Sequence, residues 1–356
     1  MRRTKNEGNT MRQSLRAPLR IVTPAIVAAL LVAITPHEGC AQEKVTIAAF
    51  KGSFINFPMY VANDLKLFEK HGVKVELMYA TGGQVATMLA SGATNMSGVS
   101  VENGLAIAAK GQDVKLIVLN QTVPPFTLIV RNDVKLPNAG KPYPEMLKDL
   151  KGLKIGISNR GASSDHVLQF LIKEAGLDPR TDVQIIAAGE PPAQIAALKN
   201  NVIDGALAFE PTQSQAVAGM KIAKPLLDIQ GGEGPEIFRE YAYNGLFARS
   251  SFIASHTDAI KRVVAAIVEA EEMINDPAQL DAVTQVAVNN MGGMEPALLR
   301  DYIKRLHGIF VPIASRKAIE NVLQLLSIQG RLDKPLTYEG VVATDLMPKT
   351  FGKKTN

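Results

Sequence analysis

The chain is poor in cysteine and has no tryptophan. It contains one cysteine, Cys40, in 356 residues. A single cysteine excludes a disulfide-stabilised scaffold, a multi-cysteine zinc site and an iron–sulfur cluster. No apolar run reaches the length of about 20 residues that a membrane-spanning helix needs. With 46% hydrophobic and 21% charged residues, the composition is that of a globular protein with two domains or one large one.

The sequence motifs of several enzyme classes are also absent. There is no P-loop, no Gly-x-Gly-x-x-Gly after a strand-like segment and no Gly-x-Ser-x-Gly nucleophile turn. The five histidines form no His-x-x-x-His pair, and isolated histidines are mostly surface or structural residues. We therefore predict no catalytic residue, no metal site and no cofactor.

The excess of positive charge lies in the first 41 residues. The formal net charge is +5 and the pI is about 9.1. Residues 1–41 contain six basic and two acidic residues, which leaves 33 basic and 32 acidic residues in the remainder. Because nucleic-acid binding requires a basic face, we expect no nucleic-acid partner.

Residues 1–41 have the layout of a secretory signal peptide. Arginines precede an apolar run over residues 21–35, and Gly39 and Ala41 supply the small side chains that cleavage after Ala41 requires. Met11 as the initiator would give a leader of more usual length. We predict export to the periplasm, which leaves a mature chain of about 315 residues without cysteine.

Two other interpretations of the leader remain open. It could be a buried N-terminal helix, or Cys40 could carry a lipid anchor. The residues before that cysteine, Pro-His-Glu-Gly, fit lipidation poorly because such signals favour small or aliphatic side chains.

Strand-like and helix-like segments alternate along the mature chain. Strands are predicted at residues 45–50, 73–79, 95–99, 114–119, 126–130, 153–158, 183–187 and 203–209. Helices are predicted at residues 59–70, 84–91, 101–110, 163–175 and 192–199, and after residue 255 at 259–274, 280–289, 296–306 and 315–329. The proline-containing stretch 131–148 is predicted to be a loop, and the polar residues from 349 a frayed end. Strands separated by helices indicate parallel βαβ units. A weak likeness between residues 88–95 and 195–204 suggests two similar lobes.

Polar turns follow five of the predicted strands. Ligand crevices form beyond the carboxyl ends of parallel strands, so these turns are the candidate binding segments. The candidate residues are Ser53, Phe54 and Asn56, then Gly82, Gly83 and Gln84, then Ser100 and Asn103, then Gly161, Ala162, Ser163 and Ser164, and finally Glu210.

Different ligand chemistries suit different turns. Glycines and serines at the start of a helix leave backbone N–H groups free for an anion, and Arg160 adds a guanidinium. The Glu210 carboxylate could instead hold an amino group or a ring N–H. Each turn also has a purely structural interpretation, as an ordinary helix cap, turn or solvated acid.

Longer motifs resemble those of a known family. They are residues 57–62 (FPMYVA), 67–73 (LFEKHGV), 81–84 (TGGQ), 89–92 (LASG), 149–156 (DLKGLKIG), 161–164 (GASS) and 209–211 (FEP). With these motifs the chain resembles, over nearly all of residues 43–330, the periplasmic solute-binding proteins of the nitrate, sulfonate, taurine and thiamine-pyrimidine class. Those proteins serve ABC importers.

The resemblance implies an α/β, bilobal periplasmic-binding-protein fold. It would have two mixed, mainly parallel sheets with flanking helices and a two-crossover hinge near residues 128–131 and 244–247. The implied division is a first lobe of residues 42–129 and 247–330, a second lobe of residues 130–246 and a C-terminal tail of residues 331–356.

The resemblance also implies a function. We expect the extracytoplasmic substrate-binding component of an ABC importer, a monomer that closes around a small ligand and docks on a permease in the inner membrane. A small organic anion, a sulfonate or carboxylate, is the first ligand choice. A pyrimidine-like nitrogen heterocycle stacked on Phe54 or Phe57 is the alternative.

Other functions are less well supported. The similar enzymes, a pyrimidine synthase and a sulfinate desulfinase, need cysteine, which the mature chain is predicted to lack. A receptor's sensory module would need a membrane attachment, and a structural or nucleic-acid role would need a basic face.

Overall fold

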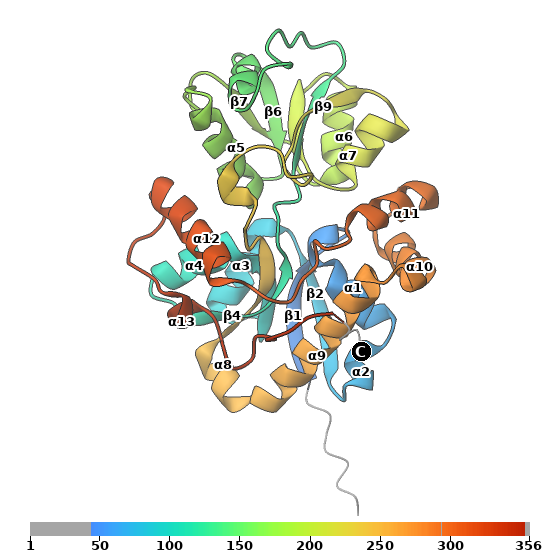
Figure 1. Cartoon of the computed structure of the whole chain (residues 1–356), viewed down its shortest axis with the longest axis vertical. Coiled ribbons are helices and arrows are strands. Elements are labelled where there is room, and N and C mark those ends of the chain that lie inside the picture. The colour runs from blue at the N-terminus through green and yellow to red at the C-terminus, as the bar shows by residue number, and fades with distance from the viewer. Residues whose placement is uncertain (1–43, 293, 353–356) are drawn as a thin grey trace, which may run out of the picture. The chain divides into compact units, whose positions relative to one another are not determined.

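The computed structural model describes residues 44–292 and 294–352. The predicted signal peptide and Cys40 lie outside these residues. The described residues belong to one compact unit, which holds two five-stranded sheets (Figure 1). None of the described helices combines the length and the hydrophobicity needed to cross a bilayer.

The first sheet has the strand order β2-β1-β3-β10-β4. Its strands are β1 (Lys44–Phe50), β2 (Lys74–Ala80), β3 (Met96–Ser100), β4 (Val114–Gln121) and β10 (Asn244–Arg249). Strand β1 pairs in parallel with β2 and β3, whereas β10 pairs antiparallel with β3 and β4. Four strands therefore run in one direction, and β10, which returns from the second lobe, runs against them.

Helices cover both faces of the first sheet. They are α1 (Phe57–Asp64), α2 (Leu67–Lys70), α3 (Gly82–Ser91), α4 (Val101–Ala109), α8 (Ser250–Ser255), α9 (Thr257–Asn275), α10 (Leu280–Asn290), α11 (Pro296–Arg305), α12 (Arg316–Ile328) and α13 (Tyr338–Val341). Figure 1 shows α3, α4, α12 and α13 on one side and α1, α9, α10 and α11 on the other.

Alternation along β1 separates the cores on these two faces. Val45, Ile47 and Ala49 pack with α1, α9, α10 and α11. Ala48 points to the opposite face and packs with α3, α4 and α12. Successive strand side chains point to opposite faces, so a strand that is buried on both sides is apolar at nearly every position, as residues 45–49 are. The exception is Thr46, whose hydroxyl donates to Asn95 Oδ1 at 2.8 Å.

The second sheet has the order β7-β6-β8-β5-β9. Its strands are β5 (Thr127–Arg131), β6 (Lys154–Ile157), β7 (Gln184–Ala187), β8 (Gly205–Ala208) and β9 (Ala223–Asp228), with helices α5 (Ser163–Glu174), α6 (Pro191–Lys199) and α7 (Thr212–Ser214). Strand β6 pairs in parallel with β7 and β8, and β5 is antiparallel to β8 and β9. The predicted pair of mixed, mainly parallel sheets is confirmed.

The chain changes lobes at other positions than those predicted. Strand β5 pairs with β8 and β9 from Thr127 onward, so the first crossing precedes it, between β4 and β5, rather than lying at 128–131. The second crossing lies between β9 and β10, and the residues predicted as the crossing, 244–247, are the strand β10 itself. An apolar run shows that a strand exists, but only its hydrogen-bonded neighbours show which sheet it joins.

Three local predictions also need correction. Residues 59–70 form two helices, because Lys66 has φ 60° and breaks the run. Strand β9 was not predicted. The residues predicted as a C-terminal tail from 331 pack on the first lobe: Val341, Val342, Leu346 and Met347 are buried, and Leu116 of β4 forms a parallel bridge with Val342.

Candidate functional site

A cavity lies at the carboxyl ends of strands from both sheets. The space open to the centre of a water-sized sphere measures about 40 Å³, room for a few water molecules. Its lining residues are Phe50, Ser53, Ile55, Ser100, Asn103, Phe126, Ser158, Ala162, Ser163, Ser164, Glu190, Phe209 and Tyr243. They come from both lobes and both crossings, which is the location predicted for the ligand.

Three of the predicted turns reach the cavity. Ser53 follows β1, Ser100 ends β3 and Asn103 lies in the first turn of α4. The triplet 162–164 opens α5. Ser53 Oγ accepts a hydrogen bond from the Ile55 N–H at 3.2 Å. Ser100 Oγ accepts one from the Asn103 N–H at 3.4 Å. These hydroxyls hold their helix starts in place and still present a polar atom to the cavity.

The serines of α5 connect the second lobe internally and to the first. Ser164 Oγ lies 2.9 Å from Ser158 Oγ and accepts a bond from the Ser158 N–H. Ser163 Oγ donates to the Glu102 carboxylate of α4 at 3.4 Å. The polar floor of the cavity is therefore fixed by hydrogen bonds within and between the lobes.

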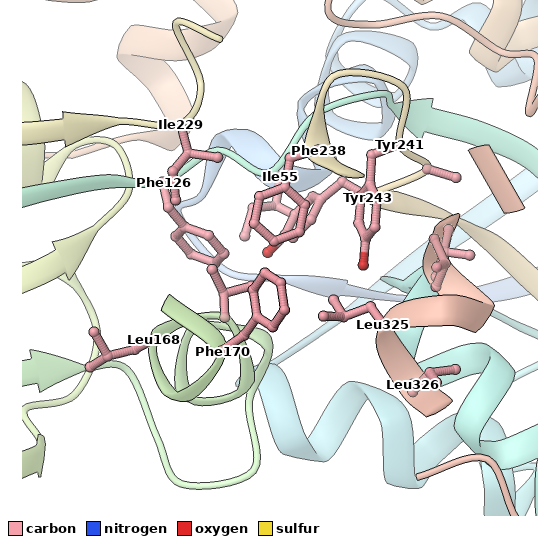
Figure 2. Packing of buried hydrophobic residues seen from close by; sticks show 14 of the residues in the cluster. Ile55, Phe126, Leu168, Phe170, Ile229, Phe238, Tyr241, Tyr243, Leu325 and Leu326 are labelled. Carbon is pink, nitrogen blue, oxygen red and sulfur yellow. The ribbon is translucent and has the colours of Figure 1, made fainter. Parts of the chain in front are cut away.

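Aromatic rings form the apolar part of the lining. Phe126 of the first crossing meets Tyr243 of the second nearly edge-on, with ring centroids 5.7 Å apart. Phe126 also contacts Phe209, which follows β8, at 6.3 Å between centroids. Figure 2 shows Phe126, Ile55 and Tyr243 converging in the buried cluster that also holds Phe170 and Phe238.

Two predicted residues of the first turn are in the core of the first lobe instead. Asn56 is fully buried; its Oδ1 accepts from the Phe50 N–H at 2.8 Å and its Nδ2 donates to Asn244 Oδ1 at 3.0 Å. Phe54 packs on the rings of Phe57 and Tyr302 with centroids 4.9 and 4.7 Å apart. These side chains stabilise the strand end that carries Ser53.

The glycine turn after β2 does not line the cavity. Gly82 and Gly83 open α3, and Gln84 completes a capping box in which its Oε1 accepts from both the N–H and the hydroxyl of Thr81. Strand β2 is one of the two edge strands of its sheet, so its carboxyl end lies away from the centre. This turn is therefore an ordinary helix cap rather than part of the cavity.

The predicted anion-binding groups at α5 are engaged elsewhere. Gly161 donates its N–H to Asp165 Oδ2 at 2.8 Å, and Arg160 Nη1 lies 2.9 Å from Asp165 Oδ1. Arg160 is absent from the cavity lining. The guanidinium that the anion hypothesis relied on is thus already paired with a carboxylate.

Glu210 is a buried carboxylate that caps the helix following it. Its oxygens accept from the Ser214 N–H at 2.9 Å and the Ser214 hydroxyl at 2.6 Å. Arg305 Nη2 of α11 lies 3.3 Å away. Burial raises the pKa of Glu210, and the bonds from Ser214 and Arg305 oppose that rise. The residue before it, Phe209, lines the cavity, whereas Glu210 does not.

Several lining residues were not predicted. They are Phe50, Ile55, Phe126, Ser158, Glu190, Phe209 and Tyr243. Glu190 stands between β7 and α6, directly before Pro191, in the same kind of strand-to-helix turn as the predicted sites. Phe126 and Tyr243 belong to the crossings, which the sequence alone placed at other residues.

Burial shapes the titration of the lining groups. Burial raises the pKa of Glu190, the charged group among the lining residues, and burial likewise raises the pKa of the Tyr243 hydroxyl. No group of three or more His, Cys, Asp or Glu that could hold a metal occurs among residues 44–292 and 294–352. The arrangement offers hydroxyls, one amide, aromatic faces and one carboxylate, which suits reversible binding of a small organic molecule.

One protein-family model matches this chain. The model of the NMT1-like family matches residues 40–288. A protein of Brucella abortus (strain 2308), named as a binding protein, is 26% identical over 216 residues; the match covers 60% of this chain and 61% of that protein. YtlA of Bacillus subtilis (strain 168), also named as a binding protein, is 22% identical over 327 residues, or 88% of this chain and 93% of YtlA.

Solved structures share the fold. The alkanesulfonate-binding protein SsuA of Xanthomonas axonopodis pv. citri, bound to MOPS, superposes with a TM-score of 0.66 at 18% identity over 86% of this chain and 98% of SsuA. The nitrate-binding protein NrtA of Synechocystis PCC 6803 gives 0.66 at 14% identity, over 86% and 87%. The desulfurization enzyme DSZB gives 0.59 at 16%, over 86% and 97%.

Proposed function

The chain belongs to the NMT1-like family, and from this premise we propose that it is the extracytoplasmic ligand-binding component of an ABC importer. It captures a small molecule in the cavity at the strand ends and closes over it by motion about the two crossings. The carrying observation is that this cavity is lined by residues of both lobes and of both crossings. A ligand there contacts both lobes only when they are closed, so binding favours the closed form.

The partners and the location follow from this role. The closed form would dock on a permease in the inner membrane, and the binding protein would act as a monomer in the periplasm. The predicted leader supports this location, and so do the solved structures of the same fold that are named as periplasmic. N-terminal sequencing of protein from a periplasmic extract tests it: a mature chain that begins after Ala41 is expected, and a lipid on Cys40 would contradict it.

The anionic ligand remains a prediction. SsuA and NrtA, which share the fold, are named for alkanesulfonate and nitrate. The cavity of this chain supports such a ligand less well, because Arg160 is paired with Asp165 and the glycine turn lies at an edge strand. The alternative, a nitrogen heterocycle, suits a cavity with several aromatic faces.

A ligand panel tests the proposal. Thermal shift and calorimetry with sulfonates, aromatic carboxylates and pyrimidines should yield one binder with a dissociation constant in the range of about 1 μM, or −8 kcal/mol. Turnover of that binder by the purified protein would contradict a binding role and favour an enzyme of the kind that DSZB represents.

A further inference from the structure

Glu190 presents the cavity with a carboxylate that the protein does not neutralise. It directly precedes α6, and its side chain makes no capping bond to that helix. Its backbone carbonyl accepts from the Ala193 and Gln194 N–H groups, but within residues 44–292 and 294–352 its carboxylate has neither an ion pair nor a hydrogen bond. It is partly buried, so its charge is partly removed from water without an internal partner, which is costly.

The neighbouring acids differ in this respect. Glu102 is bound by Arg331 and His166. Asp165 is bound by Arg160 and Glu210 by Arg305. The protein thus supplies a cationic partner to each of these carboxylates and leaves Glu190, the one that faces the cavity, without one.

The remaining lining gives Glu190 no positive counterpart. Among the described lining residues there is no lysine, arginine or histidine; the polar atoms are hydroxyls and the Asn103 amide. An anionic ligand would therefore face a carboxylate of like charge at close range. A cation would gain from that carboxylate and from the faces of the aromatic rings.

We propose that Glu190 determines ligand specificity by pairing with a positively charged, N–H-bearing group on a flat ring, such as an amidine or a protonated amino-heterocycle. The ring would lie against the aromatic cluster of Phe126, Phe209 and Tyr243, and the N–H group would donate to the carboxylate. This inference rests on the proposed function, because it concerns the ligand of the same cavity.

Three probes of nearly the same shape test the charge preference. Benzamidine is cationic, benzamide neutral and benzoate anionic, and calorimetry with the full mature chain compares them. The wild-type protein should bind benzamidine at least tenfold more tightly than either of the others. The Glu190→Gln variant keeps the shape of the side chain and should lose at least tenfold in benzamidine affinity while it leaves benzamide binding within twofold.

A control variant separates this effect from general loss of negative charge. Glu145→Gln removes an exposed carboxylate of the same lobe that pairs with Lys148, and it should bind benzamidine like the wild type. Preference for benzoate, an unchanged preference in Glu190→Gln or binding of none of the three probes would overturn the inference. The proposed function depends instead on the wider ligand panel, so the two can fail independently.

Discussion

The Arg331 guanidinium forms an ion pair with the Glu102 carboxylate where the two lobes meet. Arg331 follows α12 and Glu102 lies on α4, both in the first lobe. His166 of α5, in the second lobe, lies 2.9 Å from Glu102 and 2.8 Å from Arg331 through its Nδ1. Arg331 also donates to the Asn103 amide oxygen at 2.7 Å, so this cluster fixes one polar residue of the cavity lining.

Removing Arg331 should destabilise the protein strongly. Glu102 is 2% exposed, and the Arg331→Met variant would leave its charge buried without its main partner. We expect a loss of about 3 kcal/mol in the free energy of unfolding, measured with urea. The double variant with Glu102→Gln should recover more than half of that loss. A single variant within about 0.5 kcal/mol of wild type would contradict the buried pairing.

The ion pair between Arg305 and Glu210 should contribute much less to the free energy of unfolding than the pair between Arg331 and Glu102. Its side chain is 54% exposed, and Glu210 keeps both hydrogen bonds from Ser214 when the arginine is removed. Arg305→Ala should therefore cost at most about 1 kcal/mol, with the cost shrinking as salt is added. A loss as large as that of Arg331→Met, in the same urea assay, would show that Glu210 depends on the arginine.

Glu271 should make stability fall as the pH rises. It is fully buried in α9, neither carboxylate oxygen has a hydrogen-bond partner among the described residues, and burial raises its pKa well above the usual value. The protonated form is favoured in the folded state, so the stabilisation it gives is complete below the unfolded pKa of about 4.3 and disappears as the pH rises through the folded pKa.

The Glu271→Gln variant tests this linkage. It should unfold at a higher temperature than wild type at pH 8, and the difference should vanish near pH 4. Its exposed neighbour provides the control, since Glu272→Gln should follow the wild-type pH profile. Parallel wild-type and Glu271→Gln profiles from pH 4 to pH 8 would refute a raised pKa.

Two glycines should respond in opposite ways to alanine. A Cβ at Gly205 of β8 would lie 2.6 Å from the Ile129 carbonyl oxygen of the neighbouring strand, so Gly205→Ala should cost about 1–3 kcal/mol. A Cβ at Gly83 of α3 would meet nothing within 4 Å, and Gly83→Ala should stabilise the helix by about 0.5 kcal/mol.

The same Gly83→Ala variant also tests the cavity. Because Gly83 does not line the cavity, the Gly83→Ala variant should bind the ligand with the same affinity as the wild-type protein. A loss of ligand affinity, measured by calorimetry, would show that the glycine turn is part of the binding site, as the sequence predicted.

Local patterns were enough to predict most of the secondary structure. The alternation of apolar strand and helix segments depends on neighbouring residues, and so does the helix-capping chemistry of Ser53 and Ser100. As a result, three of the five polar turns that the sequence predicted as binding segments do contribute residues to the cavity lining. The family motifs added the two-lobed arrangement, which the mixed sheets confirm.

The sequence by itself determined most of the strands and helices, which turns carry polar groups and that the residues after 41 are nearly neutral in charge. Only the tertiary structure decided which of those turns meet. Strand order placed β2 at an edge and its glycine turn away from the cavity, while Glu210 found its partners in Ser214 and Arg305, the latter 95 residues away. It also left the Glu190 carboxylate at the cavity with no partner among the described residues. Partners and strand order depend on contacts between residues far apart in the chain, and no local pattern records them.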